Sequence, residues 1–336
     1  MNMSRKYKLT VLTADISRLL EESNNGVDKS VILNTNFDNL KFVYYRLPKL
    51  RKIIDYLLDS NIKEEIIKQD KFFKSNYFNY LKLNMECDVP DSVQEIITFY
   101  NQYNEDSYFS YKEMYNYVFN ESSKKLQNTY DLKFGNIKEY FSRGTYCTYC
   151  SVCQQRINIG SRDLDHFLNK QYFPILCLMQ ENLIPMCTIC NRIYKQTELP
   201  QLPVVHPFQV KFPIENIPIR LKTLTELEII DADLPPEYIN YIKLMDLKNR
   251  LTHLDIKKNL EDIIWAVQEE SRKQVTKGMN FKSVLKIVND VITDYINSEL
   301  LVIASYFYIN TKILESMNNS IFSKRIACKI HREVNN

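Results

Sequence analysis

The sequence predicts an α+β fold that is mainly α-helical, with one small irregular module near the middle of the chain. Two observations predict it. Apolar residues recur at helical spacing over most of the first 140 residues and again from Leu247 onward. Between these parts, from Gly144 to about Cys187, that period is lost and Pro, Gly and Cys occur together. We therefore expect three regions: a helical domain over 1–140, the irregular module over 141–200, and an extended linker followed by a helical domain over 201–336.

The first helical region has recognisable helix starts. Pro48 favours the beginning of a helix, and its core face would be formed by Leu50, Ile53, Ile54, Leu57 and Leu58. Two further starts resemble capping boxes, in which Ser92 pairs with Glu95 and Ser110 with Glu113. After the module, the Pro-rich stretch from Pro200 to Pro236 contains short alternation at Leu227, Glu228 and Ile229. That pattern indicates extended segments or a linker.

The charge balance limits the classes of function. The chain has 336 residues, and 44 Lys and Arg stand against 41 Asp and Glu, a net charge of +3. Such a balance excludes a protein held on nucleic acid by bulk charge, as a histone is. Any contact with phosphate groups must therefore come from a local patch.

No segment of the sequence predicts a membrane span. The longest strongly apolar run, from Leu300 to Ile309, is much shorter than the ~20 residues needed to cross a bilayer. The first fifteen residues lack the uninterrupted apolar stretch of a secretion signal. We expect a cytoplasmic protein, and in that reducing compartment its eight cysteines favour metal binding over disulfides.

Two Cys-x2-Cys pairs are the strongest local signal. They are Cys147 with Cys150 and Cys187 with Cys190. Two residues between thiols allow both sulfurs of a tight turn to face one ion, and two such turns complete the tetrahedral four-thiolate shell that zinc prefers. A closed shell of this kind is structural, so the sequence predicts a structural zinc site.

The first pair has an alternative. Cys150 and Cys153 have the same spacing, so Cys153 competes with Cys147 as a ligand. We prefer Cys147 and Cys150. The three remaining cysteines stand alone and are expected to act as small core residues: Cys87, Cys177 and Cys328.

The residues between the cysteine pairs carry a resemblance to a known family. Asp165 and His166 are adjacent, Asn182 opens an Asn-Leu-Ile-Pro stretch before the second pair, and Asn191 follows Cys190 directly. Over roughly Tyr146 to Lys195 the chain resembles the zinc-stabilised HNH endonucleases of the ββα-metal (His-Me finger) superfamily. It is especially similar to phage Holliday-junction resolvases and to bacterial defence-associated HNH nucleases. The motif of this family usually ends in His. This chain has Asn191 at that position, and its side chain still offers an oxygen ligand.

The resemblance implies a role for each motif residue. His166 would be the general base, because a neutral imidazole accepts a proton at cellular pH. Asp165 and Asn191 would hold a catalytic Mg²⁺ or Mn²⁺ through hard oxygen atoms. Asn182 would brace the intervening loop by bonding backbone groups. Since adjacent strand residues point to opposite faces, the strand must end or distort at Asp165 and His166.

Other polar residues of the module have weaker indications. Asp163 shares a strand face with Asp165 and is either a supporting acid or simply exposed. Lys195 lies one helical turn after Asn191, and it is a candidate phosphate contact together with Lys170 and Arg192, although a solvated lysine is the ordinary alternative. The other histidines are assigned no catalytic role: His206, His253 and His331.

Two basic runs are candidate nucleic-acid surfaces. One consists of Lys41, Arg46, Lys49, Arg51 and Lys52, and the other of Lys324, Arg325, Lys329 and Arg332. A solvated helix face is the more common reason for such runs.

The sequence thus predicts a metal-dependent HNH endonuclease that hydrolyses phosphodiester bonds, with DNA favoured over RNA and 5′-phosphate ends expected from the resemblance. The helical flanks suggest target recognition or docking to a partner, and chains of this layout resemble effector subunits of bacterial anti-phage systems that work with an ATPase. Two alternatives stay open: a ribonuclease, for example one that cleaves tRNA, and a catalytically inert zinc subunit that binds nucleic acid or serves assembly. The oligomeric state is not predicted.

Overall fold

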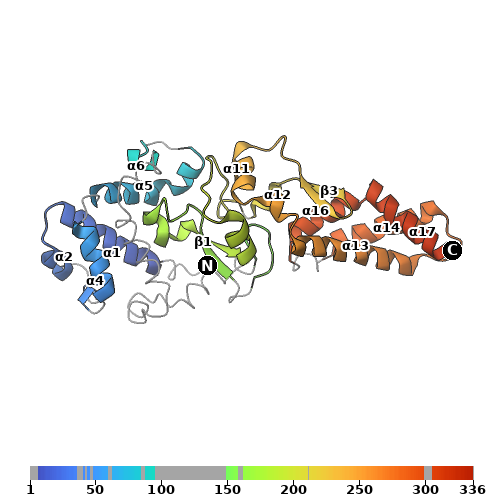
Figure 1. The fold of residues 1–336 in the computed structure, drawn as a ribbon, viewed down its shortest axis with the longest axis horizontal. Coiled ribbons are helices and arrows are strands. Elements are labelled where there is room, and N and C mark those ends of the chain that lie inside the picture. The colour runs from blue at the N-terminus through green and yellow to red at the C-terminus, as the bar shows by residue number, and fades with distance from the viewer. Residues whose placement is uncertain are drawn as a thin grey trace.

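The fold is that of a computed structural model. It describes residues 7–35, 41, 44–45, 48–59, 63–84, 88–94, 149–157, 162–210, 212–298 and 305–335. The described chain is mainly helical and contains two small antiparallel sheets, so the α+β class is confirmed. The helical regions lie at the two ends of an elongated molecule, with the first sheet between them (Figure 1).

The described part of the N-terminal region contains helices α1 (Tyr7–Asn24), α2 (Lys29–Thr35), α4 (Pro48–Asp59), α5 (Lys63–Leu81) and α6 (Asp91–Gln94). The expected helix start at Pro48 is confirmed, since α4 begins there. On its predicted core face, Ile54 and Leu58 are buried. The second half of the first capping box, Glu95, and the whole of the second, Ser110 with Glu113, lie outside the described residues.

The central module contains β1 (Arg162–His166) and β2 (Leu183–Cys187), which pair antiparallel with Asp165 opposite Ile184. Two short 3₁₀ turns connect them, η5 (Pro174–Leu178) and η6 (Gln180–Asn182). A π-helix, η7 (Ile189–Lys195), follows β2 after one residue. β1 ends at His166, as the adjacent Asp165 and His166 required.

The C-terminal region begins with a short hairpin. After the turn η8 (Pro213–Asn216), β3 (Ile219–Thr223) pairs with β4 (Glu226–Ile229), where Leu227 and Ile229 are buried. The alternation seen in the sequence therefore marks a strand. The described residues after the hairpin form helices α11 (Pro236–Leu244), α12 (Leu247–Arg250), α13 (Leu254–Gln274), α14 (Phe281–Ile296), α16 (Phe307–Met317) and α17 (Ile321–Asn335). The last four form the arm at the right of Figure 1.

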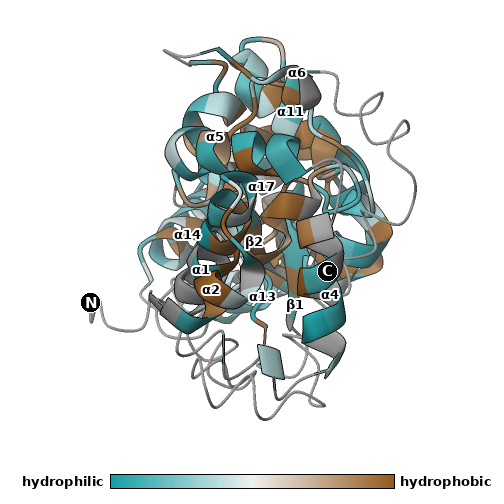
Figure 2. Cartoon of the chain, turned by 90° about the vertical axis from the view of Figure 1, so that its left-hand side faces the viewer, coloured by the Kyte–Doolittle hydropathy of each residue, from teal (hydrophilic) through white to brown (hydrophobic). Residues whose placement is uncertain are grey.

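A continuous hydrophobic core runs through the described chain. It extends from Phe73 in α5 through Ile184 and Met186 in β2 to Val288 in α14 and Ile330 in α17. β2 is buried at all five of its residues. In the end-on view of Figure 2, hydrophobic segments gather toward the middle and the outer turns are largely hydrophilic. The core thus joins the central module to both helical regions.

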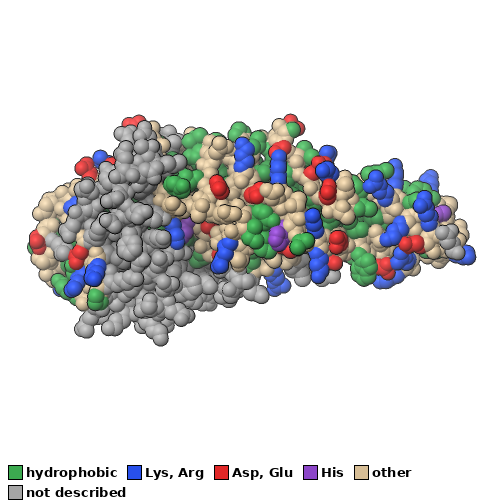
Figure 3. Space-filling view, viewed as in Figure 1, with side chains coloured by type: hydrophobic (Ala, Val, Ile, Leu, Met, Phe, Trp, Pro, Cys, Tyr) green, Lys and Arg blue, Asp and Glu red, His purple; other side chains and the backbone are tan. Residues whose placement is uncertain are grey.

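Charged side chains of both signs are interspersed on the face shown in Figure 3. Arg51 and Lys52 of the first basic run are exposed, whereas Arg46 lies outside the described residues. All four members of the second run are exposed on α17: Lys324, Arg325, Lys329 and Arg332. No helix among the described residues is long and apolar enough to pass through a bilayer.

Candidate functional site: a four-cysteine centre beside a carboxylate network

Four buried cysteines converge at one point of the central module. The Sγ atoms of Cys150, Cys153, Cys187 and Cys190 all lie within 4.8 Å of one another. This set differs at one position from the set that the sequence favoured. Cys153 accompanies Cys150, as in the alternative pairing, and Cys147 lies outside the described residues.

The four sulfurs fit a tetrahedral metal ion. A Zn–S bond of about 2.3 Å implies a separation of about 3.8 Å between sulfurs at the corners of a tetrahedron. The Cys153 and Cys187 sulfurs are 3.9 Å apart. The backbone N–H of Cys190 also donates to Cys187 Sγ at 3.4 Å, so the second Cys-x2-Cys turn already curls around its first sulfur. Four soft donors in this arrangement suit zinc.

Burial and neighbouring groups shift the pKa values of the cluster's thiols in different directions. Burial raises the pKa of Cys150 and of Cys190. Burial opposes ionisation of Cys153 too, but hydrogen bonds from the neighbouring thiols and the charge of Arg250 hold the pKa of that thiol well below its usual range. Cys153 therefore ionises more readily than Cys150 or Cys190.

Asn182 is fully buried and links three segments of backbone and side chain. Its Oδ1 accepts from the Leu168 N–H at 2.7 Å and from the Tyr77 hydroxyl at 2.8 Å. Its Nδ2 donates to the Leu168 carbonyl at 2.9 Å and to the Leu176 carbonyl at 3.3 Å. These bonds fix the loop that follows β1, which is the bracing geometry that the resemblance implied for this residue.

Asp165 forms a buried ion pair. Its Oδ2 lies 2.8 Å from the Lys195 ammonium, and the Lys195 side chain is only 1% exposed. Lys195 also donates to the His166 carbonyl at 2.9 Å. Burial raises the pKa of the Asp165 carboxyl, while the charge of Lys195 acts against that rise. Lys195 thus ties the end of β1 to η7, and its ammonium is not directed to solvent as a phosphate contact would require.

Lys195 and Asn191 reach different carboxylates of β1 from the same helix. They lie four residues apart in η7, a π-helix in which the Gln196 N–H donates to the Asn191 carbonyl at 2.8 Å. Both side chains face β1 from this helix. Lys195 reaches Asp165, whereas Asn191 reaches a different carboxylate.

That carboxylate is Asp163. Its Oδ2 accepts from Asn191 Nδ2 at 3.1 Å and from Arg192 Nε at 3.0 Å, and its Oδ1 accepts from Arg192 Nη2 at 3.1 Å. The structure therefore joins Asn191 to Asp163 rather than to Asp165. Of the two interpretations of Asp163, the supporting acid is favoured. Arg192 is largely exposed, so this pair faces solvent.

His166 ends β1 with a buried imidazole. Its Nε2 lies 3.0 Å from the Cys177 carbonyl oxygen. Burial, with the positive charges of Lys170 and Lys195, lowers the pKa of His166 to about 3. The ring is therefore neutral at cellular pH. The structure brings His166 to the same strand end as Asp165, where its Nε2 lies against the backbone of Cys177.

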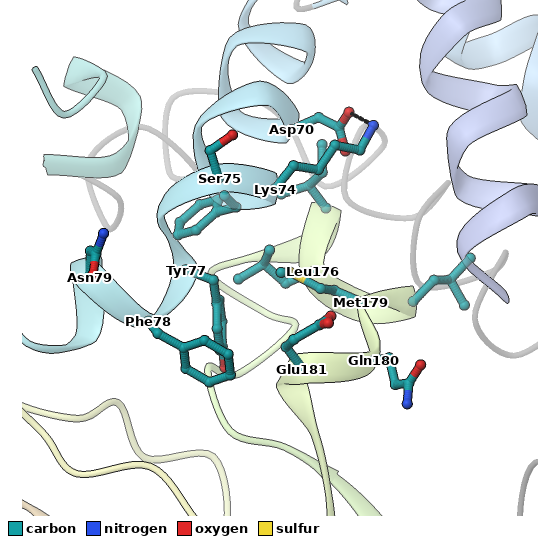
Figure 4. A pocket seen from close by; sticks show the side chains of 13 residues that line it. Asp70, Lys74, Ser75, Tyr77, Phe78, Asn79, Leu176, Met179, Gln180 and Glu181 are labelled. Atoms are coloured by element: carbon teal, nitrogen blue, oxygen red, sulfur yellow. Dashed lines mark ion pairs between the residues drawn. The ribbon is translucent and has the colours of Figure 1, made fainter. Parts of the chain in front are cut away.

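A pocket of about 390 Å³ lies behind this loop, between α5 and the two 3₁₀ turns. Figure 4 shows Tyr77 and Phe78 of α5 facing Leu176, Met179 and Glu181 across it, with the Asp70–Lys74 ion pair at one side. Burial, with the charges of Glu181 and Asp165, raises the pKa of Tyr77, so its hydroxyl stays a donor to Asn182.

His206 and Cys177 are buried in the interior of the protein. His206 is buried among aromatic rings, and its ring centroid is 4.3 Å from that of Phe167. Cys177 is buried, as expected of a core residue, while Cys328 is half-buried and Cys87 lies outside the described residues.

One residue beside the cysteines had no sequence signal. Arg250, at the end of α12, is fully buried and donates to the sulfurs of Cys190 and Cys153. It lies 60 and 97 residues from these cysteines, so local spacing does not reveal it.

No known protein family, curated protein or solved structure matches the chain. The site is therefore interpreted from its own residues and from the motif resemblance.

Proposed function

We propose that this protein is a metal-dependent endonuclease of the HNH type, which hydrolyses phosphodiester bonds in DNA. The observation that carries the proposal is the bond from Asn191 Nδ2, in η7, to the Asp163 carboxylate, in β1. It joins the helix to the hairpin beside His166 in a β-β-helix order. The four-cysteine cluster next to both elements is the second support.

The proposed role of His166 is to accept a proton from the attacking water. Its imidazole is neutral, but the burial that keeps it neutral also makes it a weak base, so this role requires water or substrate to reach the ring. Asn182 supports this role by fixing the backbone at Leu168, two residues beyond the histidine. Arg192, largely exposed beside Asp163, is the best-placed candidate for a phosphate contact, with half-buried Lys170 as a second.

Asp163, Asp165 and Asn191 offer the hard oxygen donors that suit Mg²⁺ or Mn²⁺. Such an ion would supply positive charge against the charge that develops on the phosphate and the leaving oxygen. Both carboxylates already pair with a cationic side chain, Asp163 with Arg192 and Asp165 with Lys195. Binding a divalent ion there therefore requires exchange of one of these partners for the ion.

The substrate and cellular context follow from the resemblance alone. DNA is favoured over RNA, and the helical regions on both sides of the module suit an anti-phage effector that works with an ATPase subunit in the cytoplasm. The second candidate function, an inert zinc subunit for nucleic-acid binding or assembly, is favoured by one observation: Lys195 already neutralises the buried Asp165 carboxylate.

The experiment compares cleavage of duplex DNA, single-stranded DNA and tRNA with Mg²⁺ or Mn²⁺. We expect DNA cleavage, and we expect His166→Ala, Asp165→Asn and Asn191→Ala each to lower its rate by ~10²-fold or more. His331→Ala and the exposed Asn216→Ala are matched controls that keep the wild-type rate. Cleavage of tRNA alone selects the ribonuclease. Cleavage that is absent, or unchanged in His166→Ala at full zinc content, selects the inert subunit.

A further inference from the structure

Arg250 connects the cysteine cluster to the C-terminal arm, which comprises α13, α14, α16 and α17. Its Nε lies 3.3 Å from Cys190 Sγ and its Nη2 lies 3.4 Å from Cys153 Sγ. One guanidinium therefore contacts one cysteine from each Cys-x2-Cys turn. The side chain is 0% exposed, so water does not compensate its charge.

The other edge of the guanidinium is held by a carboxylate. Asp255, in the first turn of α13, accepts from Nη1 at 2.7 Å and from Nη2 at 2.8 Å. Asp255 in turn accepts from the Tyr306 hydroxyl at 2.5 Å. A bidentate carboxylate of this kind fixes the orientation of the guanidinium, and here it directs the remaining N–H groups to sulfur.

The chemistry of the donors indicates the charge state of the cluster. A guanidinium is charged at every relevant pH and has no acceptor. A thiol is a poor acceptor, whereas a thiolate is a good one, and four thiolates around a divalent ion carry a net charge of about −2. Asp255 compensates one edge of the guanidinium, and the N–H groups at the other edge, which face sulfur, gain more from a metal-thiolate cluster than from four neutral thiols.

The segment before α16 binds the same cysteine turn through backbone. The Tyr306 N–H donates to the Gln154 carbonyl at 3.0 Å, and the Tyr308 N–H donates to Gln154 Oε1 at 2.8 Å. The Arg156 N–H donates to Ser305 Oγ at 3.1 Å. The loop that supplies Cys150 and Cys153 is thus also the docking surface of residues 305–308.

We propose that Arg250 is the counter-charge of a four-thiolate zinc ion, and that zinc binding thereby fixes residues 305–308 of the C-terminal arm on the Cys150–Arg156 loop. Arg250 is a positioning residue in this proposal. The inference rests on metal binding by the four cysteines and is independent of nuclease activity.

The test measures metal affinity in the full-length protein. Zinc affinity is determined by competition with a chromophoric chelator, and Co²⁺ substitution reports the four-sulfur ligand field. We expect Arg250→Gln to lower zinc affinity by ~10- to 100-fold while the cobalt spectrum keeps its four-sulfur form. The exposed Arg220→Gln on β3 is the matched control and keeps wild-type affinity.

Arg250→Lys is the second variant, because it keeps the positive charge that Arg250→Gln removes. A single ammonium lacks the guanidinium's fork of donors, so we expect an affinity loss of at least threefold. Hydrogen exchange completes the test. Removing zinc from the wild type is expected to speed exchange at the Tyr306 and Tyr308 amides at least tenfold more than at Val267 in α13.

Wild-type affinity in both Arg250 variants overturns the proposal, as does a wild type without a four-sulfur cobalt spectrum. Exchange at Tyr306 and Tyr308 that does not depend on zinc overturns the link to the arm. A protein that binds zinc through Arg250 but cleaves no DNA leaves this inference standing and removes only the nuclease.

Discussion

The Tyr77 hydroxyl donates a 2.8 Å hydrogen bond to Asn182 Oδ1 across 105 residues of sequence. Both side chains are buried, and Asn182 uses its other bonds on the backbone of Leu168 and Leu176. The N-terminal helix α5 therefore holds the loop on which His166 depends. The Tyr77–Asn182 hydrogen bond therefore contributes both to the stability of the fold and to the geometry of the site.

Removing either partner is expected to destabilise the fold by different amounts. Tyr77→Phe removes one donor and should lower the free energy of unfolding by about 1 kcal/mol. Asn182→Ala leaves the Leu168 N–H and two carbonyls without their buried partner, so about 3 kcal/mol or more is expected. Urea unfolding monitored by circular dichroism measures both, with the exposed Asn216→Ala as control. An Asn182→Ala variant as stable as Asn216→Ala would contradict the bracing role.

Cys153, rather than Cys147, is expected to be the fourth zinc ligand. Purified protein should contain about one zinc per chain. Cys153→Ser is expected to lose most of this zinc because its sulfur lies in the cluster, whereas Cys147→Ser should keep it. Elemental analysis of the two variants decides between them, with buried Cys177→Ser as a control that retains zinc. Zinc loss in Cys147→Ser alone restores the pairing that the sequence favoured.

The buried ion pair between Asp165 and Lys195 is expected to tolerate loss of both partners better than loss of one. Lys195→Met leaves a buried carboxylate without its cation, which costs about 3–5 kcal/mol. Adding Asp165→Asn should recover part of that loss. The free energies of unfolding of the single and double variants form the measurement.

A surface ion pair provides the control for this cycle. Lys248 Nζ lies 2.7 Å from Asp231 Oδ2, and both side chains are partly exposed. Lys248→Met should therefore lower the free energy of unfolding by at most about 1 kcal/mol. Equal losses of unfolding free energy in Lys195→Met and Lys248→Met would show that burial does not make the Asp165–Lys195 pair more important for stability than a surface pair.

His206 makes stability depend on pH. Burial lowers the pKa of His206 to about 3, against about 6.5 in an unfolded chain. Because the folded state holds this ring neutral, its contribution is complete above pH 6.5 and is lost as pH falls from there toward 3. Between pH 7 and pH 5 the wild type should lose about 2 kcal/mol more than His206→Phe, whose ring suits the aromatic surroundings. Parallel stability curves for the two proteins would refute this assignment.

The parts of the fold that the sequence predicted depend on local periodicity. Pro48 marked the start of α4, and alternation at Leu227 and Ile229 marked β4. The apolar spacing after Val284 is confirmed as far as Ile296, the end of α14, and Phe307 begins α16. Periodicity identifies such elements because each reports burial of one face by residues close in sequence.

The parts of the site that escaped prediction depend on contacts between distant residues or on unusual backbone. Two Cys-x2-Cys spacings share Cys150, so spacing alone does not choose between Cys147 and Cys153. Helical spacing made Lys195 a candidate phosphate contact beside Asn191, whereas the structure buries its ammonium against Asp165. Arg250 and Tyr306 reach the cluster only through tertiary packing.

The bonds from Tyr306 and Tyr308 to Gln154 also set an order of assembly during translation. A ribosome delivers Cys150 and Cys153 some 150 residues before the segment that covers their loop. The turn that carries Cys150 and Cys153 is therefore not covered by Tyr306 and Tyr308 until about the last tenth of the polypeptide emerges. The cysteine turn is thus synthesised well before the residues that cover it.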